Sequence, residues 1–283
     1  AGHVRCMAGT PLSDTRNVPM SKDRKKRKGL WIYNLLIVIL LGVVAYCAYQ
    51  LISARITDNK GEQVYEKAAQ AAAGVTGSSS AQAGSQASAA AETETDASGN
   101  EVAVRSIDFT ALKAINAETV GWLVCEGTVL DYPVVQGADN SYYLTHLIDG
   151  TEHRFGTLFV DYLNSPGFTD DNTIIYGHHI KAGDMFKVLS YYQDQGDSYY
   201  QQHPTMMLYT PERNYRLDIF AGCLIDGENG VPLVFASREE FAAYIARLKA
   251  SSTFSSSVAM TPEDKMVTLY TCAYDFEGAR YVV

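Results

Sequence analysis

The sequence from Met266 to Val283 reads MVTLYTCAYDFEGARYVV and holds two short apolar runs on either side of a polar loop. Each run has the β-branched and aromatic residues typical of a strand, and the first ends at Cys272. Gly278 permits a tight return of the chain, so the sequence predicts a hairpin that brings Arg280 beside Cys272. A fixed positive charge there can stabilise an oxyanion, whereas the alternative is a surface ion pair with a nearby acidic residue.

A cysteine becomes a useful nucleophile only when a base or a cation lies close, because a free thiol with a pKa of about 8.5 is mostly protonated at neutral pH. A candidate base follows another apolar strand, TIIYGHH, at residues 173–179. A histidine such as His178 can take the thiol proton and later deliver it to a leaving amine. A solvated turn or half of a metal site is the alternative. No further cluster of ligands completes a metal site, so we expect no metal.

Together these features resemble the sortase family. The resemblance rests on the TLxTC signature at Thr268–Cys272, a Gly-His pair at a strand end and an arginine shortly after the cysteine. It covers roughly Ile107–Val283. Two further segments carry the family resemblance, GWL at 121–123 and DYPVVQGADNSYYL at 131–144. Three other features resemble class B in particular: YGHH at 176–179, DMF at 184–186 and the long helix at Ser237–Ala250.

The resemblance implies a cysteine transpeptidase that cleaves a C-terminal sorting signal of surface proteins. Cys272 is expected to attack the carbonyl of the threonine in that signal and form a thioacyl enzyme. An amine of cell-wall peptide then resolves it, and no cofactor takes part. By motif position His178, not His179, is the acid/base, and Arg280 steadies the bound threonine and the oxyanion.

The resemblance also suggests where substrate lies. Asn140, Leu144, Tyr270 and Thr271 are expected to line the substrate groove. Class B members often carry a serine where this chain has Tyr270, so we expect a difference in groove shape or specificity at this position.

The predicted fold is mainly β, a closed sortase-type β-barrel with an N-terminal helix at Phe109–Ala117. One long helix, Ser237–Ala250, precedes the TLxTC strand and opens with a Ser237-x-x-Glu240 capping box. Closure of the barrel removes exposed strand edges. The strand candidates are Val120–Val124, Val129–Val135, Thr157–Val160, Thr173–Tyr176, Met206–Tyr209, Tyr215–Leu224 and Met266–Thr271.

The N-terminal part has the composition of a membrane anchor. SKDRKKRK at 21–28 precedes an uncharged segment, 30–52, which is long enough as a helix to span a bilayer. A cleaved signal peptide is the competing interpretation, but its apolar part is shorter and precedes a small-residue cleavage site. We therefore expect a single-pass membrane protein with a cytoplasmic basic N-terminus and an extracellular catalytic domain. The resemblance to sortases implies a Gram-positive cell envelope.

These features divide the chain into four parts. Residues 1–29 comprise a leader without a structural role and the basic N-terminus, and 30–52 form the transmembrane anchor. Residues 53–103 form a polar segment, with a short helix at 56–70, and an Ala/Ser/Gly-rich stalk. Residues 104–283 form the catalytic domain.

The net charge excludes one class of binding partner, and the cysteine count bears on whether the domain contains a disulfide. From Ser106 onward there are 11 basic and 23 acidic residues, a net charge of −12, which excludes the basic surface that nucleic-acid binding needs. Cys125 and Cys223 are predicted to be buried free thiols, and a disulfide between them is the alternative.

Four other functions are the alternatives at this point. A pilin-polymerising sortase would use a lysine amine as acceptor. A catalytically silent surface domain on a stalk would not need the cysteine, histidine and arginine together. A papain-like hydrolase would carry its cysteine on a helix and before the histidine, and an L,D-transpeptidase would show an SHGC-like signature, which is absent here.

Overall fold

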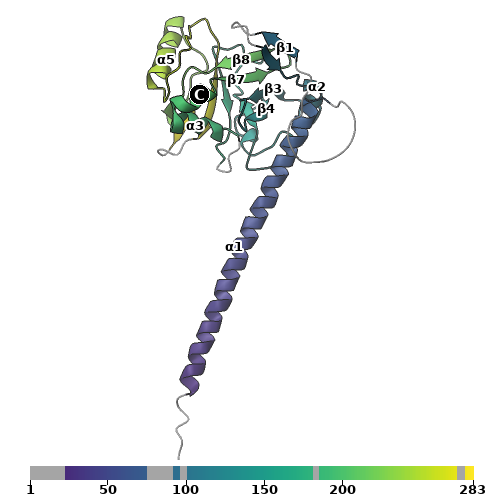
Figure 1. Cartoon of the computed structure of the whole chain (residues 1–283), viewed down its shortest axis with the longest axis vertical. Helices are drawn as coiled ribbons and strands as arrows, with labels where there is room; N and C mark the ends of the chain where they lie inside the picture. Colours follow the sequence, from purple (N-terminus) through teal and green to yellow (C-terminus); the bar gives the residue numbers. More distant parts are fainter. Residues whose placement is uncertain (1–22, 75–91, 96–100, 181–184, 273–277) are drawn as a thin grey trace, which may run out of the picture. The chain divides into compact units, whose positions relative to one another are not determined.

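The computed structural model describes residues 23–74, 92–95, 101–180, 185–272 and 278–283. It divides into two compact units, residues 1–56 and residues 57–283 (Figure 1). Helix α1, Asp23–Ala72, runs through both. In the first unit its large apolar side chains between Trp31 and Ile52 are exposed. By length and composition, this part of α1 is apolar enough to cross a membrane.

In the second unit the end of α1 is part of the folded domain. Ala68 and Ala72 are fully buried and pack in one cluster with Leu112 and Trp122. This differs from the expectation that residues 53–103 lie outside the domain, because small alanines permit close helix packing without a large apolar residue. Strand β1, Glu92–Thr95, lies within the expected stalk and pairs antiparallel with β2, Glu101–Val104.

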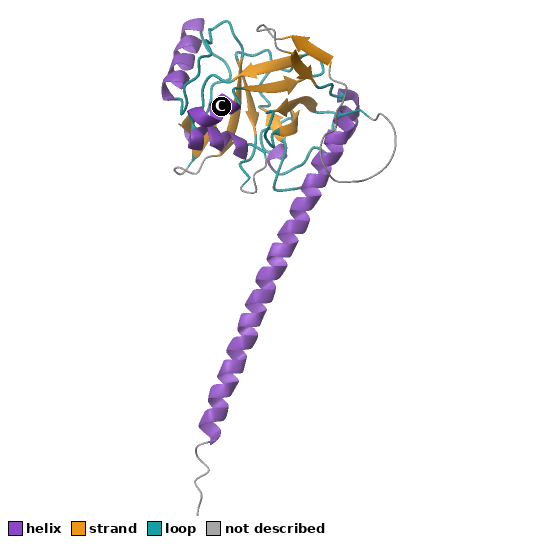
Figure 2. Ribbon diagram, in the orientation of Figure 1, coloured by secondary structure: helices purple, strands orange, loops and turns teal. Residues whose placement is uncertain are grey.

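Among the described residues, nine strands form one sheet in the order β8-β7-β3-β4-β5-β6-β10-β11-β9. Figure 2 draws the strands in orange and the helices in purple. Their bounds are β3 Thr119–Val124, β4 Asp131–Val135, β5 Leu158–Val160, β6 Asn172–Tyr176, β7 Thr205–Tyr209, β8 Asn214–Asp218, β9 Cys223–Asp226, β10 Met266–Cys272 and β11 Ala279–Val282. The predicted strand Tyr215–Leu224 is wrong in one respect, because it is two strands that lie at opposite ends of this order. The order starts at β8 and ends at β9, and the described residues form no β8–β9 ladder. The closed barrel therefore stays a prediction.

Two of the ladders are parallel, β4 with β5 and β6 with β10. The β6–β10 ladder begins with Met266 opposite Asn172, and near this start the Thr268 hydroxyl donates a buried hydrogen bond of 2.8 Å to the Asn172 side-chain oxygen. Beside it, Asp171 accepts bonds from Arg238 at 2.9 Å and from Lys265 at 3.1 Å. Burial, the largest effect, would raise the pKa of Asp171, but these two cations together hold it below its usual value. The charged cluster ties the entry of β10 to that of β6.

The described residues of the domain include four shorter α-helices. They are α2 Phe109–Ile115, α3 Lys187–Gln195, α4 Asp197–Gln202 and α5 Arg238–Ser251. The Ser237 side chain accepts from the backbone N–H of Glu240 and caps α5. The apolar side of α5, which includes Phe241 and Ile245, packs against Cys223 and other residues of the sheet. Helices α3 and α4 were not predicted from the sequence.

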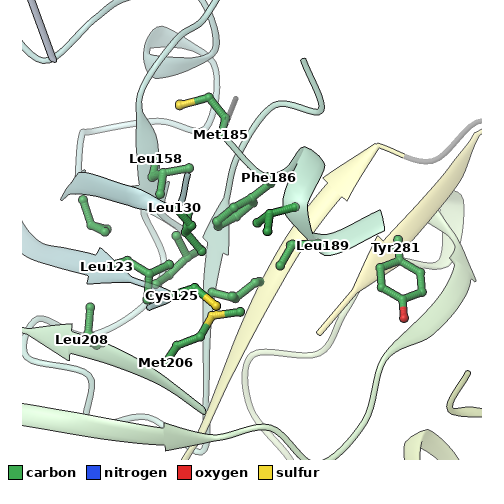
Figure 3. Packing of buried hydrophobic residues seen from close by; sticks show 14 of the residues in the cluster. Leu123, Cys125, Leu130, Leu158, Met185, Phe186, Leu189, Met206, Leu208 and Tyr281 are labelled. Atoms are coloured by element: carbon green, nitrogen blue, oxygen red, sulfur yellow. The ribbon is translucent and has the colours of Figure 1, made fainter. Parts of the chain in front are cut away.

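The main core fills the space between the strands and α3. Figure 3 shows Cys125, Leu130 and Met206 pointing toward one another in this core, with Phe186 and Leu189 from the α3 side. These side chains are buried. The core therefore packs Phe186 and Leu189 against the sheet.

We predict that Ala68→Leu destabilises the folded domain by about 1–3 kcal/mol, because a larger side chain does not fit a fully buried position without moving its neighbours. Leucine is nearly as good a helix former as alanine, so intrinsic propensity accounts for little of the loss. Urea unfolding of the full chain in detergent micelles measures this change in the free energy of unfolding. Gln70→Leu, at an exposed position two residues away, is the control. Equal stability of the two variants would contradict the assignment of this helix end to the domain.

Candidate active site

Two strands that are distant in sequence, β6 and β10, end side by side. Tyr176 is aligned with Tyr270 in their parallel ladder. The backbone N–H of Gly177 donates to the Tyr270 carbonyl at 3.1 Å, which extends the contact past the end of β6. His178 follows Tyr176 by two positions, as Cys272 follows Tyr270. The register therefore brings His178 and Cys272 to the same end of neighbouring strands.

The third predicted residue arrives from the next strand. In the antiparallel β10–β11 ladder Arg280 is the direct partner of Cys272, so the predicted hairpin is confirmed. The Arg280 side chain is half-buried, and its Nη1 donates to the Ala279 carbonyl at 2.9 Å. Its stem passes close to Gly227, where an added Cβ would lie 2.9 Å from the Arg280 Cγ. The loop acids that form the alternative ion pair lie outside the described residues.

The His178 ring is held by a backbone carbonyl. Its Nε2 lies 2.6 Å from the carbonyl oxygen of Leu144. Because a carbonyl only accepts, Nε2 carries the hydrogen, and Nδ1 is left for exchange with another group. The histidine backbone is also fixed, since its carbonyl accepts from Phe186 N at 3.0 Å. His179 has a different setting, because it forms a backbone bridge with Met185.

Gly177 leaves the room that the histidine needs at the end of β6. A Cβ at this position would lie 2.5 Å from side-chain carbons of both Leu158 and Phe186. Any larger residue would therefore displace the segment that carries His178.

Asn140, predicted to line the groove, is bonded at both ends of its side chain. Its Nδ2 donates to Asp161 at 2.9 Å, and its Oδ1 accepts from Tyr162 N at 3.1 Å. The same Asp161 oxygen accepts the Tyr176 hydroxyl at 2.8 Å. Burial first, and then this carboxylate, raise the pKa of Tyr176, so its hydroxyl stays a donor. Asn140 is thus tied to the strand that ends in the candidate histidine.

The remaining groove candidates fall into two groups. Leu144 is partly exposed, and the Tyr270 ring packs edge-on against Tyr176 with 5.2 Å between ring centroids. Thr271 is 1% exposed, and its hydroxyl has no hydrogen-bond partner among the described residues. Because successive strand residues face opposite ways, the structure does not bring Thr271 to the face that carries Tyr270.

The other cysteines of the domain are poor nucleophiles. Cys125 and Cys223 are free and buried, which confirms the prediction of two buried thiols. Burial, the largest effect, raises the pKa of each thiol and keeps it protonated. Cys272 differs in position, because it stands at a strand end between the neighbouring strands β6 and β11.

Residues 123–283 match the sortase domain family. The chain belongs to the sortase family.

Its relatives are class B sortases. Sortase B of Listeria monocytogenes is 36% identical over 175 residues, covering 61% of this chain and 70% of the relative. Sortase B of Staphylococcus aureus is 33% identical over 178 residues, covering 62% and 72%. These similarities confirm the prediction of a class B sortase and support cysteine transpeptidase chemistry.

Solved sortase B structures share the fold. The S. aureus enzyme is similar with a TM-score of 0.58 at 32% identity, over 62% of this chain and 83% of that one. The B. anthracis enzyme gives a TM-score of 0.64 at 26% identity, over 80% and 96%. The common fold is a curled, β-barrel-like sheet with an N-terminal helix.

Two features of this sortase site are not predicted from the sequence. Asp161 links Asn140 to Tyr176, and Gly227 lies against the stem of Arg280. Asp161 directly follows an apolar strand, which is the signal that identified His178. Gly227 gives no comparable signal, because its role depends on a residue of a distant strand.

We predict that Asn140→Asp destabilises this sortase by about 1–3 kcal/mol, because an oxygen replaces the amide donor that faces the Asp161 carboxylate. Asn214→Asp makes the same chemical change at an exposed position of β8 and is expected to have little effect. Thermal unfolding of both variants at pH 7 gives the comparison. Similar unfolding temperatures for the two would contradict the supporting role assigned to Asn140.

Proposed function

We propose that this sortase cleaves a C-terminal sorting signal after its threonine and transfers the surface protein to an amine of cell-wall peptide. The observation that carries the proposal is the register that brings Cys272, His178 and Arg280 to one end of β6, β10 and β11. Similar solved structures include an S. aureus sortase B–substrate complex and a sortase B complexed with triglycine. These complexes support a substrate peptide and an amine acceptor for this chain also.

In the first half-reaction, Cys272 is the nucleophile and His178 takes its proton. The thiolate sulfur bonds to the threonine carbonyl carbon and gives a tetrahedral oxyanion. Arg280 stabilises this developing charge. The scissile C–N bond then breaks, and His178 donates its proton to the leaving amine. The products are a thioacyl enzyme and the released C-terminal fragment.

In the second half-reaction, the acceptor amine attacks the thioester carbon. His178 removes the amine proton, the C–S bond breaks, and the new amide forms. The departing thiolate regains a proton from His178, which restores the starting state. Because Nε2 of His178 is bonded to the Leu144 carbonyl, we assign the proton exchange to Nδ1.

We also propose that the apolar part of α1 anchors the enzyme and that the catalytic domain faces outward. The length and composition of this helix and the basic segment before it support that orientation. Sorting signals and acceptor amines both lie at the outer membrane face, so an anchor places the site within their reach.

We further propose that Leu144 and Tyr270 line the substrate groove and that the Tyr270 side chain narrows it.

We predict that His178→Ala lowers transpeptidation kcat/KM about 1,000-fold, because it removes the acid/base. His179→Ala lowers it less than about tenfold, since this residue forms a backbone bridge with Met185 beside the site, which alanine can also form. Cys272→Ala gives the background rate. Initial rates with a quenched sorting-signal peptide measure all three, and a more severe loss in His179→Ala would show that the motif is aligned one residue out.

We predict that Arg280→Lys lowers kcat about 100-fold, because an ammonium does not reproduce the fork of donors that a guanidinium offers to an oxyanion. Arg216→Lys, on exposed β8, is the matched control and is expected to keep full activity. If both variants kept wild-type kcat, Arg280 would have no part in the chemistry.

The proposal is tested with NPxTN-, LPxTG- and SPxTG-type peptides offered to the full chain, with a glycine peptide or a lysine side chain as acceptor. Cleavage after threonine and ligation to the glycine peptide are expected. Preference for the lysine amine would favour pilin polymerisation instead. A folded enzyme that cleaves none of the peptides would favour a silent surface domain.

A further inference from the structure

The part of α1 that belongs to the folded domain contacts the loop that precedes β5, residues 153–156. The Thr57 carbonyl lies 2.9 Å from Nε2 of His153, and Asp58 pairs with Arg154 at 2.7 Å. Further along the same helix, the Tyr65 hydroxyl donates to the Gly156 carbonyl. Three points of α1 therefore hold the segment 153–156, all within the folded domain.

The helix comes close to this loop because Gly61 has no side chain. A Cβ there would lie 2.6 Å from the His153 ring and 2.9 Å from Phe155. The Tyr65 ring also packs edge-on against Tyr132, with 5.1 Å between centroids. Tyr65 is thus fixed both by its ring and by its hydroxyl.

Gly156 in turn lies against the backbone that holds the histidine. Its φ of +59° is one that glycine adopts readily, and a Cβ would lie 2.8 Å from the Leu144 carbonyl oxygen. The next residue, Thr157, donates its N–H to the Tyr143 carbonyl at 2.9 Å. The Leu144 carbonyl is the group that accepts His178 Nε2 at 2.6 Å. A continuous series of contacts therefore runs from Tyr65 through Gly156 and Leu144 to His178.

The position of the Leu144 carbonyl decides two properties of the His178 ring. The bond to Nε2 selects which nitrogen carries the hydrogen and sets the plane of the ring. An acid/base whose ring is misplaced by about 1 Å loses about 100-fold in rate. We propose that Tyr65 and Gly156 are positioning residues that hold the Leu144 carbonyl, and through it the tautomer and orientation of His178. The inference rests on the proposed role of His178 as the acid/base.

The first test variant is Tyr65→Phe, which removes only a hydroxyl and keeps the ring packed on Tyr132. Tyr200→Phe is the matched control, because its hydroxyl is also partly buried and joins Ser256 at 2.8 Å in another part of the domain. Gly156→Ala is the stronger lesion, since its Cβ would meet the Leu144 carbonyl. The full chain in detergent micelles is used for all variants.

Two readouts separate positioning from general destabilisation. Nitrogen-15 NMR of the histidine rings reports the tautomer of His178 and does not depend on turnover. The Nε2–H form is expected in the wild type and in Tyr200→Phe, and a mixture of tautomers in Tyr65→Phe. Transpeptidation is expected to lose about tenfold in kcat in Tyr65→Phe and about 100-fold in Gly156→Ala, with KM unchanged.

The outcomes are distinct. An unchanged His178 tautomer and kcat in folded Tyr65→Phe overturn the inference even if Gly156→Ala does not fold. Equal changes in Tyr65→Phe and Tyr200→Phe also overturn it, because they indicate a general loss of stability. A tautomer change confined to Tyr65→Phe supports the positioning role even in an enzyme that cleaves none of the peptides, in which case the proposed function alone fails.

Discussion

A parallel hydrogen-bonded ladder joins β6 to β10, and the arrangement of the site depends on it. The ladder begins at Asn172, whose side-chain oxygen accepts a buried hydrogen bond from Thr268, a residue 96 positions away in the sequence. From there the register runs to Tyr176 opposite Tyr270, and both strands end at the same edge. A shift by one residue would turn every side chain of a strand to its other face. The charges around Asp171 hold the start of this register.

Local sequence patterns predicted most of the elements that form the site. Apolar strands that end in Cys272 or His178 are visible in the sequence, and the hairpin that returns Arg280 follows from Gly278. The predicted strand Tyr215–Leu224 is two strands, because hydrophobicity alone does not reveal a turn that sends its halves to opposite edges of the sheet. Helices α3 and α4 are rich in tyrosine, serine and glutamine, and their helical form depends on buried contacts such as those of Tyr192.

Contacts between segments that are distant in the sequence could not be predicted from local sequence patterns. The sequence places the end of α1 before the folded domain, since neither Ala68 in the predicted polar helix nor Ala72 in the predicted stalk is a large apolar residue. Only their buried neighbours assign them to the domain. The sequence around Gly156 likewise does not predict its role. That role depends on its positive φ, on the bond from Tyr65 to its carbonyl and on its closeness to the Leu144 backbone. These contacts join residues 57–72 of α1 to the backbone around the candidate histidine. The end of this helix is therefore part of the folded domain that carries the candidate site.

We propose that the strand ends of β6, β10 and β11 form one acyl-transfer site with Cys272 as its nucleophile. The most direct measurement is intact-mass and peptide-mapping mass spectrometry of the full chain after reaction with a sorting-signal peptide in the absence of an amine. We predict an added mass equal to the peptide acyl group, located on Cys272, absent from Cys272→Ala and released by an added amine. An adduct located on Cys125 or Cys223, or none on an enzyme that nevertheless cleaves the peptide, would contradict this account.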